Sequence, residues 1–80
     1  MIQVEVRLYA TLRKHLPHQP LGEPLTLQVP EGTRLVDLLV QLGVPRNEVK
    51  TAFVNNRRQE EDYVLADGDR VAFFPPVAGG

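Results

Sequence analysis

One segment in the middle of this chain has the periodicity of a helix, and the segments on both sides of it have the periodicity of strands. Four leucines occupy the i, i+3, i+4 and i+7 positions of a single helical face: Leu35, Leu38, Leu39 and Leu42. Thr33 is predicted to be the N-cap, and Gly43 followed by Pro45 provides the stop signal. A helix with one apolar face needs a surface to cover, and here the flanking strands supply it.

Four of those flanking segments have strand character: residues 2–8, 25–29, 52–54 and 70–74. The clearest is the first, where apolar and polar residues alternate from Ile2 to Leu8. The segment 59–65 is less regular, and Tyr63 and Leu65 are its expected inward-facing side chains. The predicted connections are a short helix over 10–16, a loop over 18–24, a polar turn over 55–58 and a tight turn over 67–69.

This order of elements predicts an α+β fold in which a mixed sheet of four to five strands wraps around one main helix. Such an arrangement is the β-grasp of ubiquitin-like domains, and it places the first and last strands side by side and parallel at the centre of the sheet. The length of 80 residues predicts a single domain, 1–80, that ends in a flexible C-terminal tail over 75–80.

Composition argues against several classes of function. The net charge of −1 gives no basic surface for nucleic acid, and no apolar run approaches the about 20 residues that cross a bilayer. The expectation is therefore a cytoplasmic protein that binds neither nucleic acid nor membranes. There is no cysteine, and His15 and His18 are separated by a proline without a third ligand nearby, so no metal site is expected. No catalytic motif is found either, and the chain is not expected to be an enzyme.

The C-terminus combines a stiff base with a narrow tip. Pro75 and Pro76 cannot donate backbone hydrogen bonds, so sheet pairing should stop there and the chain should leave the domain in an extended form. The remaining tail residues become progressively smaller toward a free carboxylate: Val77, Ala78, Gly79 and Gly80. A tail of this form can enter a narrow channel in a partner, since glycine has no side chain.

Two aromatic residues are predicted to lie on the outer face of the sheet. Tyr9 and Phe74 have the opposite strand parity from Leu8 and Phe73, and parallel neighbouring strands would bring them together. Exposed aromatic residues are favoured anchors for protein contacts, so both are assigned to a partner interface, together with Pro75 and Pro76. The alternative is that they cover this face without any partner.

The closing run from Asp67 to Gly80 resembles the C-terminus of the MoaD family, the small subunits of molybdopterin synthase. The opening strand with Tyr9–Arg13, the Gly32–Thr33 helix start and Val54–Asn55 match that family more loosely. The ThiS sulfur carriers of the thiamine pathway are similar in fold and in the terminal Gly-Gly, but they usually lack the Phe-Phe-Pro-Pro run.

The resemblance implies a sulfur carrier that acts in molybdenum cofactor biosynthesis and binds no cofactor of its own. A MoeB-like activating enzyme would use ATP to adenylate Gly80, and sulfur would then replace AMP to give a thiocarboxylate. A MoaE-like large subunit would receive the tail. Arg58 lies where family members often contribute an apolar contact to the activating enzyme, so a polar contact or a salt bridge is expected there.

Other functions also fit this sequence. The chain could be a ThiS-like or other sulfur carrier, or a ubiquitin-like modifier that is joined to lysines of other proteins through Gly80. It could also be a purely structural β-grasp interaction domain, in which case Gly79 and Gly80 would be dispensable.

Overall fold

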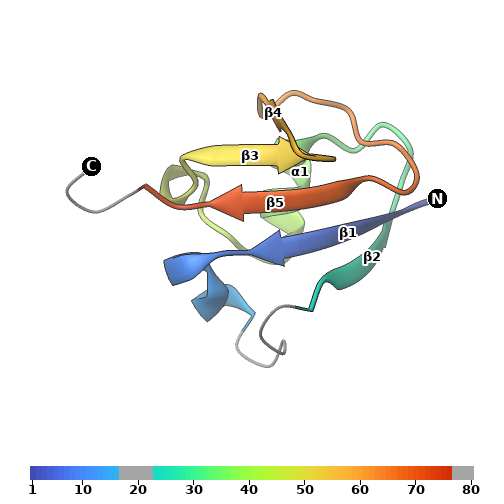
Figure 1. The fold of residues 1–80 in the computed structure, drawn as a ribbon. Coiled ribbons are helices and arrows are strands. Elements are labelled where there is room, and N and C mark those ends of the chain that lie inside the picture. The colour runs from blue at the N-terminus through green and yellow to red at the C-terminus, as the bar shows by residue number, and fades with distance from the viewer. Residues whose placement is uncertain (17–22, 77–80) are drawn as a thin grey trace.

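The computed structural model describes residues 1–16 and 23–76 (Figure 1). The elements in these ranges are β1 (Ile2–Leu8), the 3-10 helix η1 (Ala10–His15), β2 (Leu25–Val29), α1 (Leu35–Leu42), the 3-10 helix η2 (Arg46–Glu48), β3 (Thr51–Val54), β4 (Arg57–Gln59) and β5 (Arg70–Phe74). The predicted β-grasp fold is confirmed: a mixed five-stranded sheet packs on one main helix.

The strand order of the sheet is β2-β1-β5-β3-β4. β1 and β5 are parallel neighbours at its centre, as predicted (Figure 1). In their register Val6 is opposite Val71 and Leu8 is opposite Phe73. β2, β3 and β4 pair antiparallel with their neighbours. The first and last strands of the chain are therefore joined directly, and the base of the C-terminal tail is attached to the middle of the sheet.

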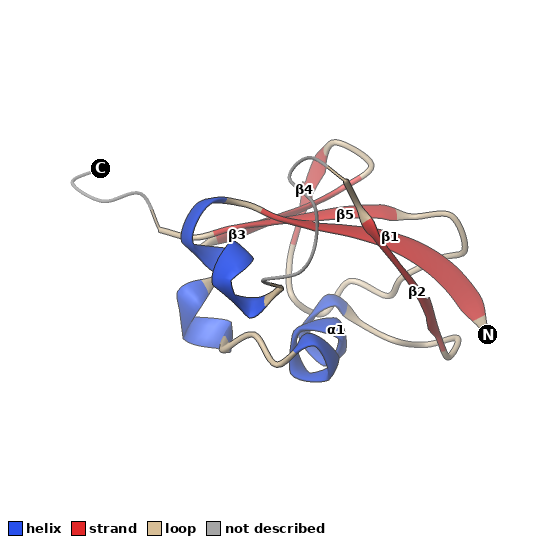
Figure 2. Cartoon of the chain, turned by 90° about the horizontal axis from the view of Figure 1, so that it is seen from below, coloured by secondary structure: helices blue, strands red, loops and turns tan. Residues whose placement is uncertain are grey.

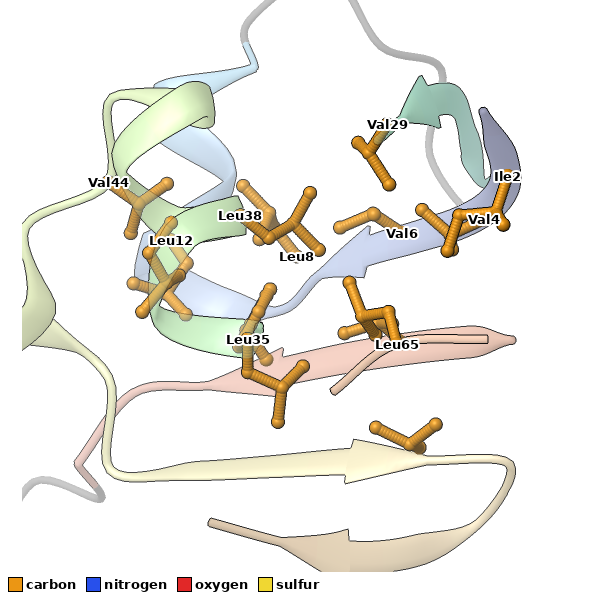
Figure 3. Packing of buried hydrophobic residues seen from close by; sticks show 14 residues of the cluster. Ile2, Val4, Val6, Leu8, Leu12, Val29, Leu35, Leu38, Val44 and Leu65 are labelled. Atoms are coloured by element: carbon orange, nitrogen blue, oxygen red, sulfur yellow. The ribbon is translucent and has the colours of Figure 1, made fainter. Parts of the chain in front are cut away.

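The helix α1 lies on one side of the sheet (Figure 2), and the apolar core fills the space between them. The alternating residues of β1 and the leucines of α1 both point into this core, as their periodicities predict. Figure 3 shows the packing of the buried side chains: Ile2, Val4, Val6, Leu8, Leu12, Val29, Leu35, Leu38, Leu39, Val44, Val54, Leu65, Val71 and Phe73.

The predicted N-cap of the helix is wrong by one residue, because Arg34 and not Thr33 occupies that position. The Thr33 hydroxyl donates a hydrogen bond to the Pro30 carbonyl at 2.7 Å and so closes the preceding turn. The Arg34 backbone N–H instead donates to the Asp37 carboxylate at 3.0 Å. An acid at the third helical position thus satisfies the first free N–H group, as in one half of a capping box.

The polar turn predicted over 55–58 is shorter than expected. Asn55 and Asn56 have φ values of 52° and 69°, in the left-handed region that asparagine tolerates, and they alone form the turn. Arg57 and Arg58 already belong to β4, where they pair with Val54 and Phe53. A two-residue loop with positive φ matches the twist of the strands that it joins, so the hairpin closes earlier than its polar composition indicates.

The other predicted elements agree with the structure where it describes them. The short helix after β1 is a 3-10 helix that buries Leu12, and in the irregular segment Tyr63 is half-buried and Leu65 is buried. The tight turn contains Gly68 with φ +86°, before β5 begins. Most of the predicted loop over 18–24 and the tail beyond Pro76 lie outside the described residues.

Candidate functional site

The base of the C-terminal tail is the end of β5. The Phe74 carbonyl accepts a hydrogen bond from the Lys50 N–H at 2.8 Å, and sheet pairing ends there as predicted. Pro75, which follows, is half-buried and Pro76 is exposed; neither has an N–H group that could extend the ladder. The other residues assigned to the tail lie outside the described part of the chain: Val77, Ala78, Gly79 and Gly80.

Three aromatic side chains meet beside this base on the outer face of the sheet, which α1 does not cover. The rings of Tyr9 and Phe74 are stacked, with centroids 4.6 Å apart and planes 7° from parallel. Phe53 of β3 meets Phe74 edge-on at 5.6 Å. We call Tyr9, Phe53 and Phe74 the aromatic cluster. The predicted proximity of Tyr9 and Phe74 is confirmed.

Sequence reasoning missed Phe53. Strand alternation could have placed Phe53 on the outer face, because its neighbour Val54 is buried and consecutive side chains of a strand point to opposite faces. Its proximity to Phe74, however, depends on β3 pairing with β5 in the register that places Phe53 opposite Ala72. That pairing joins segments that are distant in the chain, and local periodicity does not reveal it.

Arg58 lies on the same outer face as the aromatic cluster. In the β3–β4 pair it is directly opposite Phe53, so the two side chains leave the sheet on one side. Arg57 has the opposite parity and points to the other side of the sheet. The structure thus brings Tyr9, Arg58 and Phe74 to one face, next to Pro75.

A buried carboxylate holds the other end of β5 in place. Asp69 is only 5% exposed, and its two oxygens accept hydrogen bonds from the Asn55 side chain at 2.9 Å and the Ala66 N–H at 2.8 Å. The Tyr63 hydroxyl also donates to it, at 3.3 Å. Burial of this phenol, together with the adjacent Asp69 carboxylate, raises the pKa of Tyr63 above its usual value. These bonds tie the β3–β4 turn to the start of β5 and so maintain the register of the outer face.

Within residues 1–16 and 23–76, no cluster of three or more histidine, cysteine, aspartate or glutamate side chains could hold a metal ion. In the same ranges, no helix is both long and apolar enough to cross a membrane. The described residues thus form an outer-face surface of aromatic rings and arginine beside Pro75, the base of the expected tail.

Comparison with protein families gives one result that covers almost the whole chain. The model described as Mut7-C ubiquitin matches residues 1–79. No curated protein matches the chain.

Solved structures share the fold over nearly its full length. A candidate molybdopterin converting factor subunit 1 from Pyrococcus furiosus is 25% identical with a TM-score of 0.72, over 96% of this chain and 100% of its own. Small archaeal modifier protein 1 from Haloferax volcanii is 20% identical with a TM-score of 0.74, over 96% and 100%. Subunit 1 of the Helicobacter pylori molybdopterin-converting factor, solved with subunit 2, is 22% identical with a TM-score of 0.60, over 99% and 100%.

Proposed function

This chain belongs to the Mut7-C ubiquitin family, and we propose that it is a sulfur carrier whose Gly80 carboxylate is adenylated and then converted to a thiocarboxylate. It is a small ubiquitin-like protein with a β-grasp fold that sulfur carriers and small archaeal modifiers also use. The finer assignment, to the small subunit of molybdopterin synthase, is the one that the Asp67–Gly80 run favours.

One observation supports this proposal above the others: the anchor and the tail are adjacent in the chain and in space. Phe74 is both the central ring of the aromatic cluster and the last residue of β5, and Pro75 follows it immediately. A partner that binds over the aromatic cluster therefore lies next to the base of the tail. The six residues from Pro75 to Gly80 reach about 20 Å when extended, which is enough to enter the interior of a partner.

The proposed chemistry needs a separate activating enzyme, because a carboxylate is a poor electrophile. A Gly80 carboxylate oxygen attacks the α-phosphorus of ATP, and pyrophosphate leaves. A sulfide-level donor then attacks the carbonyl carbon of the acyl adenylate, the carbon–oxygen bond to AMP breaks, and AMP departs with that oxygen. One oxygen is exchanged for one sulfur, with no change in the oxidation state of the carbon. The chain catalyses neither step; it presents the group to enzymes that do.

The partners proposed are an adenylating enzyme of the MoeB kind, which uses ATP, and a large synthase subunit of the MoaE kind. The Helicobacter pylori relative, whose structure is described as a complex of subunits 1 and 2, supports the second assignment by analogy. In this scheme the large subunit accepts the tail and passes sulfur from successive carriers to the precursor of molybdopterin.

The test is to incubate the full chain with the adenylating enzyme from the same genome, ATP and a sulfide donor, and to measure the intact mass. We expect a gain equal to the difference between sulfur and oxygen, located at Gly80 by fragmentation. A variant that lacks Gly80 should keep the fold, as judged by circular dichroism, and lose the gain. If this variant still acquires sulfur, the assignment is wrong.

The likeness to a small archaeal modifier keeps conjugation as the second candidate. Activated Gly80 would then be joined to lysines of other proteins. Branched peptides that carry Val-Ala-Gly-Gly on lysine, found in cells that express this chain, would favour the modifier. A thiocarboxylate without such peptides would favour the carrier.

A further inference from the structure

The outer face of the sheet contains a half-open hollow of about 110 Å³ next to the aromatic cluster. Its floor is Ala72 of β5, whose small side chain lies between larger neighbours. Ala72 is paired with Arg7 of β1 on one side and with Phe53 of β3 on the other. The remaining residues that line the hollow are Tyr9, Asn56, Arg70 and Val71. The aromatic and aliphatic part of this lining can contact one apolar side chain from a partner, and the arginines lie beside it.

Three arginines lie on the same face as this hollow and the aromatic cluster. Arg7 and Arg70 line the hollow itself, and Arg58 projects from β4 opposite Phe53. Among the described residues, the ion pairs are formed by other cations, and none includes these arginines. The cations that form pairs include Lys14, His15, Arg34 and Arg46.

The charge of this face differs from that of the whole chain. The outer face carries Arg7, Arg58 and Arg70. Glu5 is the only acidic residue on the described strands, and it lies on the same face, paired with Arg70. The chain as a whole has a net charge of −1. Positive charge is therefore concentrated where the aromatic rings are, and an arginine without an intramolecular partner is available to a carboxylate from outside.

Aromatic residues and arginines on a sheet could also bind single-stranded nucleic acid by stacking with bases. The ring geometry disfavours that here. Tyr9 and Phe74 are stacked on each other, so one face of each ring is covered by the other ring, and Phe53 meets Phe74 edge-on. A cluster closed in this way presents an apolar surface to a protein more readily than open faces to bases.

From this geometry we infer that the outer face binds an acidic protein surface that inserts one apolar side chain over Ala72 and places carboxylates against Arg7, Arg58 and Arg70. The inference rests on the proposed function, and it adds the chemistry of the surface that the carrier must meet. Electrostatic complementarity of this kind speeds association and selects against partners with basic surfaces.

The test measures binding of the full chain to the adenylating enzyme and to the large subunit from the same genome, over a range of salt concentrations. A triple variant, Arg7→Gln, Arg58→Gln and Arg70→Gln, should bind at least one of them about tenfold or more weakly, and its binding should depend less on salt. Arg57→Gln is the matched control, because Arg57 is the exposed neighbour of Arg58 on the other side of β4. It should change binding by about twofold or less.

The outcomes separate this inference from the proposed function. If a partner binds but the triple variant and added salt leave the affinity unchanged, the acidic-partner inference is wrong and the carrier function stands. If neither protein binds, the carrier proposal fails. The inference is then decided by selecting binders to the full chain from a displayed library of three-helix domains. Selected domains with an acidic binding surface that no longer bind the triple variant support the inference. Selected domains with a neutral binding surface, or a selection that gives no binder, overturn it. Tight binding of oligo-uridine or oligo-adenosine RNA that the triple variant abolishes also overturns it.

Discussion

Phe74 connects the two parts of the site at the level of a single residue. Its ring stacks on Tyr9 and is nearly perpendicular to the ring of Phe53, while its carbonyl accepts the last sheet hydrogen bond before the prolines. Its neighbour Phe73 points to the opposite side of the sheet and is only 1% exposed. Two consecutive phenylalanines of β5 therefore lie in different surroundings: Phe73 in the core, and Phe74 in the aromatic cluster, where we propose that partners bind.

At this position we predict that Phe74→Asp weakens association with the adenylating enzyme or the large subunit by about 2 kcal/mol or more. The charge would replace the central ring of the aromatic cluster and place a carboxylate beside Tyr9 and Phe53. Isothermal titration gives the affinity. Val40→Asp is a control with the same change of charge, because Val40 is 77% exposed on α1, away from the outer face. Unchanged binding of Phe74→Asp would remove this residue from the interface.

Among the elements, α1 shows how a nearby acid replaces an N-cap side chain. The Asp37 carboxylate accepts a hydrogen bond from the Arg34 N–H and also pairs with the Arg34 guanidinium at 3.2 Å. These hydrogen bonds from Arg34, first from its side chain and then from its backbone, lower the pKa of Asp37 below its ordinary value of 3.8. The negative charge also lies favourably near the N-terminus of the helix.

The helix end therefore gives a pH-dependent prediction. Because the native pKa of Asp37 is lowered, its contribution to stability is present above pH 3.8 and is lost as the pH falls through the native value. Asp37→Asn should lower the urea midpoint at neutral pH, and the difference from the unmodified chain should shrink at about pH 2. Glu31→Gln, in the exposed turn before the helix, should give no comparable difference. If the difference in urea midpoint between Asp37→Asn and the unmodified chain stays constant with pH, the charge of the Asp37 carboxylate is not the cause of the stabilisation.

For the whole molecule, β5 is the element on which both the core and the site depend. It pairs with β1 on one side and β3 on the other, and it contributes Val71 and Phe73 to the single apolar core. The same strand carries Phe74, and the tail continues from its end. The base of the tail is therefore attached to a central strand that is paired on both sides.

This arrangement predicts that substitutions at two adjacent residues affect stability and partner binding differently. Phe73→Ala should lower the free energy of unfolding by about 3–5 kcal/mol, because it leaves a cavity in the core of a small domain. That loss is a large share of the stability expected for such a chain. Phe74→Ala should cost much less stability while weakening partner binding. Urea unfolding followed by circular dichroism compares the two, and equal losses would contradict the division of roles.

The elements of this fold were predictable from the sequence because each has a local cause. The alternation from Ile2 to Leu8 and the leucine spacing of α1 each identify a buried face without knowledge of any neighbour. The same parity rule placed Tyr9 and Phe74 on the outer side once the parallel pairing of the end strands was assumed. The expectation of a narrow tail also rests on local properties, namely residue size and proline geometry.

The remaining features depend on which distant segments become neighbours. Phe53 joins the aromatic cluster, and Arg58 stands opposite it, because β5 pairs with β3 and β3 with β4 in one particular register. Asp69 is buried because the hairpin turn at Asn55 comes back to meet it, and the hollow over Ala72 exists because larger residues flank it from both adjacent strands. Periodicity in one segment reports which face is apolar, but the partner across the sheet is set by the packing of the whole chain.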